Sequence, residues 1–261
     1  MTSVIESLSD WNRQRSSPAF QDKTLGLVPT MGNLHAGHRS LMERSRHQND
    51  ICVVSIFVNA PQFDQKEDLR SYPRTLGSDL ETARQLEIDY VICPTHKALY
   101  PDHYTYRVTE SRLSKVLCGK SRTGHFDGVL TVVLKLLMLI KPHRCYFGEK
   151  DYQQLQLIKG MLSAFFLDIE LIACPTVRDQ DGLALSSRNQ KLKASDRVLA
   201  AEFPRILSMR LPVDVVKDSL QEAGFVVEYV EEEMGRRFGA VLLGDVRLID
   251  NFLLADLGKV F

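Results

Sequence analysis

Two patterns of apolar positions alternate along the first two thirds of the chain. Short apolar runs predict strands, and the stretches between them have the apolar spacing of helices. The predicted strands are Leu25–Val28, Ile51–Val58, Tyr90–Cys93, Cys145–Phe147 and Ile169–Ala173. The predicted helices are His38–Gln48, Ser78–Leu86, Val129–Leu139 and Tyr152–Phe166. This alternation predicts an α/β fold, with a Rossmann-like parallel sheet that carries helices on both faces.

The pattern changes beyond about Asn189. Two stretches of helical spacing, Ala194–Leu207 and Val213–Ala223, precede segments of strand character at Phe225–Val230 and Ala240–Leu248, around a Gly-Asp turn signal. This order predicts a small α+β C-terminal domain. We therefore expect a Rossmann-like domain over residues 1–175 and a small lid domain over residues 176–261.

Polar clusters follow four of the predicted strands. They are Met31–His38, Asn59–Gln62, Gly148–Asp151 and Asp181–Asn189. In open parallel sheets, ligands bind outside the carboxyl ends of the strands. The four clusters are therefore expected to form one ligand site.

The first cluster contains the motif H-x-G-H, at His35 and His38. It lies where a predicted strand turns into a helix, and the free N–H groups of a helix start bind phosphate. A histidine there can donate a proton or a hydrogen bond to a phosphoryl oxygen. Taken alone, the motif also fits two ordinary surface histidines.

The other clusters carry complementary chemistry. Asn59 and Gln62 have amide donors and acceptors that suit hydroxyl and carboxylate groups. Lys150 can reach a phosphate and Asp151 a ribose hydroxyl, and Gln154 follows one helical turn later. Each cluster alone also fits a turn or a helix cap.

A polar segment before the second domain contains Ser186, Ser187 and Arg188. The guanidinium fork and the two hydroxyls form a movable anion clamp, although a plain linker has the same composition. His125 begins the longest apolar helix, and we expect it to be structural or to line the substrate site, without a catalytic role.

Composition excludes several classes of function. The 261 residues contain 33 Lys plus Arg and 33 Asp plus Glu, and no basic run with interleaved aromatic residues, so we expect no nucleic-acid partner. The longest apolar run, Val129–Ile140, contains Lys135 and is too short for a bilayer. The five cysteines are widely spaced, as in reduced proteins. We therefore expect a soluble cytoplasmic protein without a membrane partner.

Several long motifs together resemble the pantothenate synthetases, the pantoate–β-alanine ligases of the H-x-G-H nucleotidylyltransferase superfamily. They are PTMGNLHAGH, SIFVNAPQF, EDLRSYPRT, RTGHFDGV, FGEKDYQQL, DGLALSSRN and RLIDN, in that order. The resemblance implies an ATP-dependent ligase that joins (R)-pantoate to β-alanine through a pantoyl-adenylate. Its products would be AMP, pyrophosphate and pantothenate, a precursor of coenzyme A.

The resemblance also implies roles for single residues. His38 as proton donor, His35, Lys150 and Arg188 would be catalytic. Pantoate would contact Gln62, Gln154 and Asn59, and β-alanine would contact Gln62. ATP would contact Met31, Gly32, Asn33, Leu34, His35, Ala36, Gly37, His38, Gly148, Glu149, Lys150, Asp151, Val177, Leu185, Ser186, Ser187 and Arg188. The family further implies Mg²⁺ carried on the ATP phosphates, no metal site built from protein ligands, and a homodimer.

Three features depart from the usual family pattern. Ala60 separates Asn59 from Pro61, Leu185 stands where methionine is commoner, and the second domain is short. Two other functions stay open at this point. One is another H-x-G-H adenylyltransferase, which would need no pantoate pocket of Asn59, Gln62 and Gln154. The other is a non-catalytic small-molecule- or RNA-binding relative, which would not need both histidines.

Overall fold

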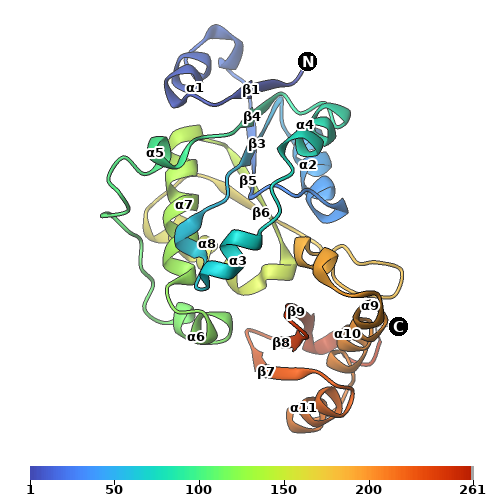
Figure 1. Ribbon diagram of the computed structural model, residues 1–261. Helices are drawn as coiled ribbons and strands as arrows, with labels where there is room; N and C mark the ends of the chain where they lie inside the picture. The colour runs from blue at the N-terminus through green and yellow to red at the C-terminus, as the bar shows by residue number, and fades with distance from the viewer. Residues whose placement is uncertain (260–261) are drawn as a thin grey trace.

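The computed structural model describes residues 1–259 and contains a six-stranded sheet of order β1-β4-β3-β2-β5-β6 (Figure 1). All neighbouring strands are parallel. The strands are β1 (Ser3–Ile5), β2 (Leu25–Thr30), β3 (Ile51–Ile56), β4 (Tyr90–Ile92), β5 (Arg144–Gly148) and β6 (Glu170–Cys174). The predicted fold class is confirmed. Strand β1 was not predicted.

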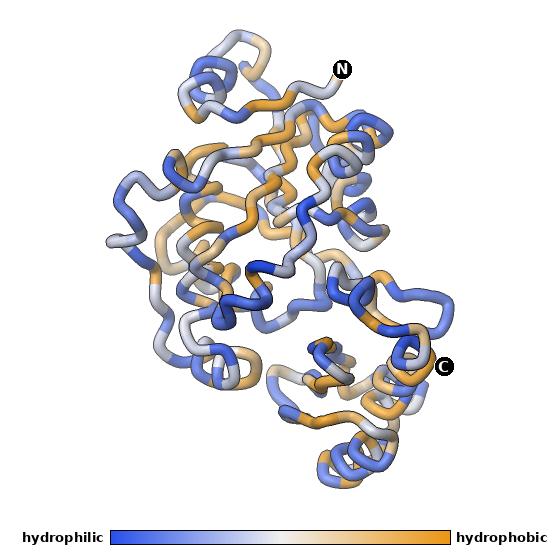
Figure 2. The backbone as a smooth tube through the Cα atoms, viewed as in Figure 1, coloured by the Kyte–Doolittle hydropathy of each residue, from blue (hydrophilic) through white to orange (hydrophobic). Residues whose placement is uncertain are grey.

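The helices of this first part lie on both faces of the sheet. They are α1 (Leu8–Arg15), α2 (Ala36–Gln48), α3 (Lys66–Ser71), α4 (Leu76–Gln85), α5 (His96–Leu99), α6 (Cys118–Ser121), α7 (His125–Ile140) and α8 (Tyr152–Ala164). Successive strand residues point to opposite faces. Leu27 and Val53 pack in the core under α7 and α8, whereas Val28 and Val54 pack in the core under α2 and α4. Figure 2 accordingly shows the central strands as continuously apolar.

The C-terminal part consists of α9 (Ala194–Ala200), α10 (Glu202–Leu207), α11 (Val213–Glu222), β7 (Val226–Glu233), β8 (Arg236–Leu243) and β9 (Val246–Leu253). Its antiparallel sheet has the order β7-β8-β9. The Gly-Asp turn signal inside the predicted segment Ala240–Leu248 is the reversal between β8 and β9, at Gly244, whose φ is +57°. One face of this sheet packs on α10 and α11. On the other face, Tyr229 and Phe238 pack against Leu117 of the first part.

The strand order locates the expected ligand crevice. From β2 the chain continues to β3 on one side, and the later strand β5 pairs on the other side. Ligands bind at such reversals of strand order, outside the carboxyl ends of the strands. Three of the predicted clusters contain short 3₁₀ helices near this crevice: η2 (Ala60–Gln62), η4 (Glu149–Asp151) and η5 (Ser187–Lys191).

Within residues 1–259, no helix is both long and apolar enough to cross a membrane.

Candidate active site

A cavity of about 250 Å³ lies in this crevice and is lined by residues from all the predicted clusters. A larger cleft of about 580 Å³ lies between the two parts of the chain. The two spaces share the rim residues Arg122, His125, Lys150, Asp151, Gln154, Ser186 and Arg188. The structure thus brings together a pocket for a small molecule and an adjoining cleft, with three cationic side chains between them.

Most residues expected to bind ligands line the smaller cavity. They are Met31, His35, Gly37, His38, Asn59, Gln62, Gly148, Lys150, Asp151, Gln154, Val177, Leu185, Ser186, Ser187 and Arg188. The other expected ATP contacts do not appear in its lining: Gly32, Asn33, Leu34, Ala36 and Glu149. The local contacts of Asn33, Leu34 and Glu149, described below, explain this difference for these three residues.

The two histidines of the motif cap helix α2. His35 is the N-cap residue, and its Nδ1 accepts a hydrogen bond from the Gly37 N–H at 3.2 Å. Nδ1 of His38 accepts in turn from the His35 N–H at 3.3 Å. This is the reciprocal arrangement of a capping box, with imidazoles in place of hydroxyl and carboxylate groups. The spacing of the two histidines therefore satisfies free N–H groups of the helix start.

The caps also determine which ring nitrogens face a ligand. Burial, followed by the charge of Lys150, lowers the pKa of His35 to about 4. Burial, followed by the charge of His35, lowers the pKa of His38 to about 3. Both rings are neutral near pH 7, and because Nδ1 accepts, the single proton is on Nε2. Each neutral ring then has Nε2–H as its only donor, and the expected role of His38 as proton donor stays a prediction.

The turn before these histidines is held from another helix. Gly32 and Asn33 have positive φ angles of +80° and +51°. The buried carboxylate of Asp79, on α4, accepts from the N–H groups of Asn33 at 3.0 Å and Leu34 at 2.8 Å. These amides are therefore directed at Asp79. No sequence motif pointed to Asp79, because it lies more than 40 residues after the turn that it holds.

Asn59 holds Gln62 in place. Its Nδ2 donates to Gln62 Oε1 at 3.0 Å and to the Gly128 carbonyl at 3.1 Å. Its Oδ1 accepts from the Tyr100 hydroxyl at 2.7 Å, and the residue is only 1% exposed. Gln62 Nε2 points to the sulfur of Met31, 3.0 Å away. The polar atoms of Asn59 are thus occupied within the protein, and Gln62 is the amide presented to the cavity.

The turn at Gly148–Asp151 is held by the C-terminal part. Nδ2 of the buried Asn251 donates to the carbonyls of Glu149 and Lys150, both at 3.0 Å. Arg236 joins this contact through Asn251 Oδ1 at 2.7 Å and the Glu149 carboxylate at 3.2 Å. Glu149 therefore turns away from the cavity, while Lys150 faces it. Asn251 belongs to the RLIDN motif, which identified the family but gave no hint of this contact.

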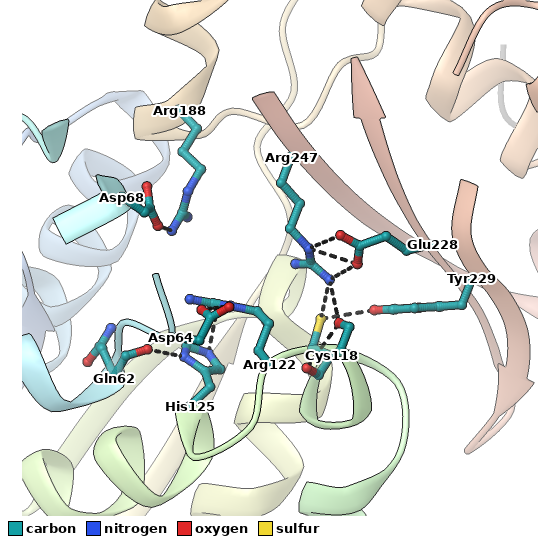
Figure 3. A network of polar contacts seen from close by, with 11 residues as sticks. Gln62, Asp64, Asp68, Cys118, Arg122, His125, Arg188, Glu228, Tyr229 and Arg247 are labelled. Atoms are coloured by element: carbon teal, nitrogen blue, oxygen red, sulfur yellow. Dashed lines mark hydrogen bonds and ion pairs between the residues drawn. The ribbon is translucent and has the colours of Figure 1, made fainter. Parts of the chain in front are cut away.

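The anion clamp is tied to an acidic residue on α3. Arg188 donates to Asp68 at 2.7 Å, and Lys191 lies 3.5 Å from the same carboxylate (Figure 3). Burial raises the pKa of Asp68, but the hydrogen bond and charge of Arg188 and the charge of Lys191 outweigh burial and lower it. The Ser187 hydroxyl donates to the Asn33 carbonyl at 3.2 Å. The clamp therefore already lies against the histidine motif.

Fold and site together define an α/β enzyme with a nucleotide-binding type of sheet. Residues 1–253 match the family model of pantoate-beta-alanine ligase. The chain is 52% identical to the pantothenate synthetase of Coxiella burnetii (strain Dugway 5J108-111) over 255 residues, 98% of each chain. It is 50% identical to that of Legionella pneumophila (strain Corby), over 96% of this chain and 99% of the relative.

Solved structures agree with these sequence matches. A pantoate-beta-alanine ligase from Francisella tularensis, crystallised with beta-gamma ATP and beta-alanine, has a TM-score of 0.93 and 39% identity, over 98% of both chains. A pantothenate synthetase from Thermus thermophilus has a TM-score of 0.88 and 34% identity, over 97% of this chain and 99% of that one.

The chain belongs to the pantoate-beta-alanine ligase family. The resemblance read from the motifs is confirmed, and so is the expected enzyme class, a ligase. The second domain is not short beside these relatives, because the matches extend over 98% of the Coxiella protein and 98% of the Francisella structure.

Proposed function

We propose that this protein joins (R)-pantoate to β-alanine in two steps, with ATP converted to AMP and pyrophosphate. The observation that carries the proposal is that two kinds of side chain line one cavity. Imidazoles and cations that suit phosphates line it at His35, His38, Lys150 and Arg188. The amides of Gln62 and Gln154 line it as well, and amide groups suit a hydroxy acid.

In the first step, a carboxylate oxygen of pantoate bonds to the α-phosphorus of ATP, and the bond from that phosphorus to the pyrophosphate oxygen breaks. Gln62 and Gln154 hold pantoate for this attack. Negative charge grows on the phosphoryl oxygens, and the Nε2–H groups of His35 and His38, with Lys150 and Arg188, stabilise it. Positioning and charge stabilisation suffice, so no enzyme nucleophile is required.

In the second step, the neutral amine of β-alanine attacks the carbonyl carbon of the pantoyl-adenylate. A carbon–nitrogen bond forms, the bond from that carbon to the AMP oxygen breaks, and the nitrogen loses a proton. β-Alanine enters from the larger cleft and binds beside Gln62, which lines the smaller cavity.

Mg²⁺ accompanies ATP in this proposal. Among residues 1–259 no group of three or more His, Cys, Asp or Glu side chains has a metal-binding arrangement, so the phosphates themselves would supply most ligands. Asp151 is the carboxylate that lines both spaces and would stand beside the ion. When bound, Mg²⁺ neutralises phosphate charge.

Three further features belong to the proposal. Residues 176–261 act as a lid that closes on ATP, with η5 as its leading edge. The protein acts in the cytoplasm, which agrees with its five free cysteines.

The protein forms a homodimer through the first domain in this proposal. Light scattering should then give twice the chain mass of 29.7 kDa. A mass of one chain would contradict the dimer.

Product analysis tests the reaction. Incubation with ATP, Mg²⁺, pantoate and β-alanine should give AMP and pantothenate in equal amounts, with no ADP. An adenylyltransferase of another kind would release pyrophosphate without forming pantothenate, and a non-catalytic relative would leave ATP unchanged. Either result would contradict the proposal.

A further inference from the structure

Three polar side chains beside the pantoate cavity are connected in series. His125 is the first residue of α7, Arg122 lies three residues before it, and Asp64 follows η2 (Figure 3). Nε of Arg122 donates to Asp64 Oδ1 at 2.9 Å, and its Nη1 lies 3.1 Å from His125 Nε2. The other ring nitrogen, Nδ1, lies 2.7 Å from the backbone carbonyl oxygen of Gln62.

The chemistry of arginine fixes the direction of every bond in this series. A guanidinium has donors only, so Nε2 of His125 must accept from Arg122. The ring proton is then on Nδ1, which donates to the Gln62 carbonyl. Asp64 holds the guanidinium in this orientation, and the side chains of Arg122 and Asp64 are only 12% and 21% exposed.

The surroundings keep His125 in this single state. Burial, followed by the charge of Arg122, lowers the pKa of His125 to about 3. The ring is therefore neutral at every pH at which the enzyme would be assayed. Because the acceptor role of Nε2 is imposed by Arg122, the donor role of Nδ1 does not alternate between the two nitrogens.

Gln62 depends on α7 for its place. A Cβ at Gly128, one turn into α7, would come within 2.6 Å of both Cα and N of Gln62, so the two backbones are in close contact. Asn59 fixes the Gln62 side chain and also bonds to Gly128. The hydrogen bond from His125 is the polar contact between α7 and the backbone of Gln62 itself.

From this geometry we propose that His125 is a positioning residue for Gln62, and that Arg122 and Asp64 orient it for that task. The hydrogen bond from Nδ1 of His125 holds the end of η2 in the position in which the side-chain amide of Gln62 contacts pantoate. This inference rests on the proposed role of Gln62 in pantoate binding. It predicts that the series of Asp64, Arg122 and His125 affects the affinity for pantoate and does not affect the affinity for ATP.

Two substitutions at one position test the inference. Asn places its Nδ2 donor near the position of the His Nδ1, whereas Leu has a similar size and no donor. In pantoate-dependent exchange of labelled pyrophosphate into ATP, His125→Leu should raise the KM for pantoate about tenfold, the effect of losing one hydrogen bond. His125→Asn should stay within about threefold of the wild type, and the KM for ATP should change in neither variant.

Arg122→Met provides a second variant, should His125→Leu not fold. It keeps the apolar stem and removes the donor that fixes His125, so the pantoate KM should rise severalfold. Thermal unfolding of each variant identifies the folded ones. The inference is overturned if folded His125→Leu and Arg122→Met keep the wild-type pantoate KM, or if the KM values for pantoate and ATP rise together. A wild-type protein without pantoate-dependent exchange would instead contradict the proposed function.

Discussion

At the scale of single residues, His35 and His38 have one observed role and one proposed role. Their Nδ1 atoms cap helix α2, which leaves each Nε2–H free to donate to a phosphate in the proposed mechanism. Because both rings are neutral, they contribute hydrogen bonds and carry no charge. The positive charge of the site then comes from Arg122, Lys150 and Arg188, which line the cavity.

A pair of substitutions at His38 separates these two functions. Asn can still accept from the His35 N–H through Oδ1 but cannot reach the phosphates, so His38→Asn should lower kcat about 10²–10³-fold with the fold intact. His38→Gln keeps an N–H donor near the Nε2 position and should retain more activity than His38→Asn. Equal activity of the two variants, measured by AMP release, would contradict the donor role.

The lowered pKa values of the buried histidines also predict acid sensitivity. In the unfolded chain His35, His38 and His125 take up protons below about pH 6.5, whereas in the folded protein their pKa values are about 4, 3 and 3. The unfolded state binds more protons in this interval, so the free energy of unfolding should fall as the pH decreases from 6.5 towards 4.

Urea unfolding at a series of pH values measures this dependence. The slope should correspond to uptake of about three protons on unfolding near pH 5, and to about one fewer in His38→Asn. A free energy of unfolding that stays constant between pH 7 and 5 would mean that the three rings take up protons over the same pH range in the folded and unfolded states, which would contradict the lowered pKa values.

At the scale of elements, the short helix η2 takes its position from α7. The two approach so closely at Gly128 that no side chain fits, and the same contact places Gln62 in the cavity. The N-terminal turn of α7 therefore shapes the proposed pantoate site through its contact with η2. Gly128 itself contacts no ligand in this proposal.

Replacing this glycine should displace η2. In Gly128→Ala the added Cβ would lie 2.6 Å from backbone atoms of Gln62 and 2.7 Å from that of Pro61, so the backbone must shift. We expect at least a tenfold higher KM for pantoate and a lower stability. Gly160→Ala in α8 is the matched control, because no atom lies within 4 Å of its added Cβ, and it should be neutral or stabilising by up to about 1 kcal/mol. Similar kinetics for the two variants would refute the close contact.

Much of the fold and the lining of the site followed from the sequence, for reasons visible in particular elements. Strands β2, β3 and β5 have apolar side chains on both faces, and the polar clusters begin where these strands end, so local patterns contained the information. Asp79, Asp68 and Asn251 were not foreseen. Each acts on a segment distant in the chain, and only folding brings it there. The sequence also did not predict that the side-chain amide of Asn59 is hydrogen-bonded within the protein. Its partners Tyr100 and Gly128 lie far from it in the chain, and folding brings them together.

At the scale of the whole molecule, the C-terminal part helps to build the site in the first part. Asn251 on β9 holds the turn that carries Lys150, and Arg236 on β8 donates to the Glu149 carboxylate at 3.2 Å. Tyr229 on β7 contacts the thiol of Cys118 at 2.9 Å (Figure 3). The two parts are thus coupled in the free protein, and ATP binds where they meet in the proposed mechanism.

Loss of the Asn251 donor should weaken this coupling. Asn251→Asp keeps the contact to Arg236 but places a carboxylate against two carbonyl oxygens, so the Gly148–Asp151 turn should loosen. We expect the KM for ATP to rise about tenfold with the pantoate KM unchanged, and faster amide hydrogen exchange in residues 149–151. Asn49→Asp serves as a control, because Asn49 is a buried hydrogen-bonded amide that lines neither cavity, and its loss should affect stability alone. An unchanged KM for ATP in Asn251→Asp would show that the Gly148–Asp151 turn keeps its conformation without the Asn251 donor.

The most direct test of the whole account is the exchange of labelled pyrophosphate into ATP in the absence of β-alanine. Reversible formation of pantoyl-adenylate predicts exchange that requires pantoate, followed by AMP release once β-alanine is added. Exchange without pantoate, or no exchange under any condition, would contradict the account.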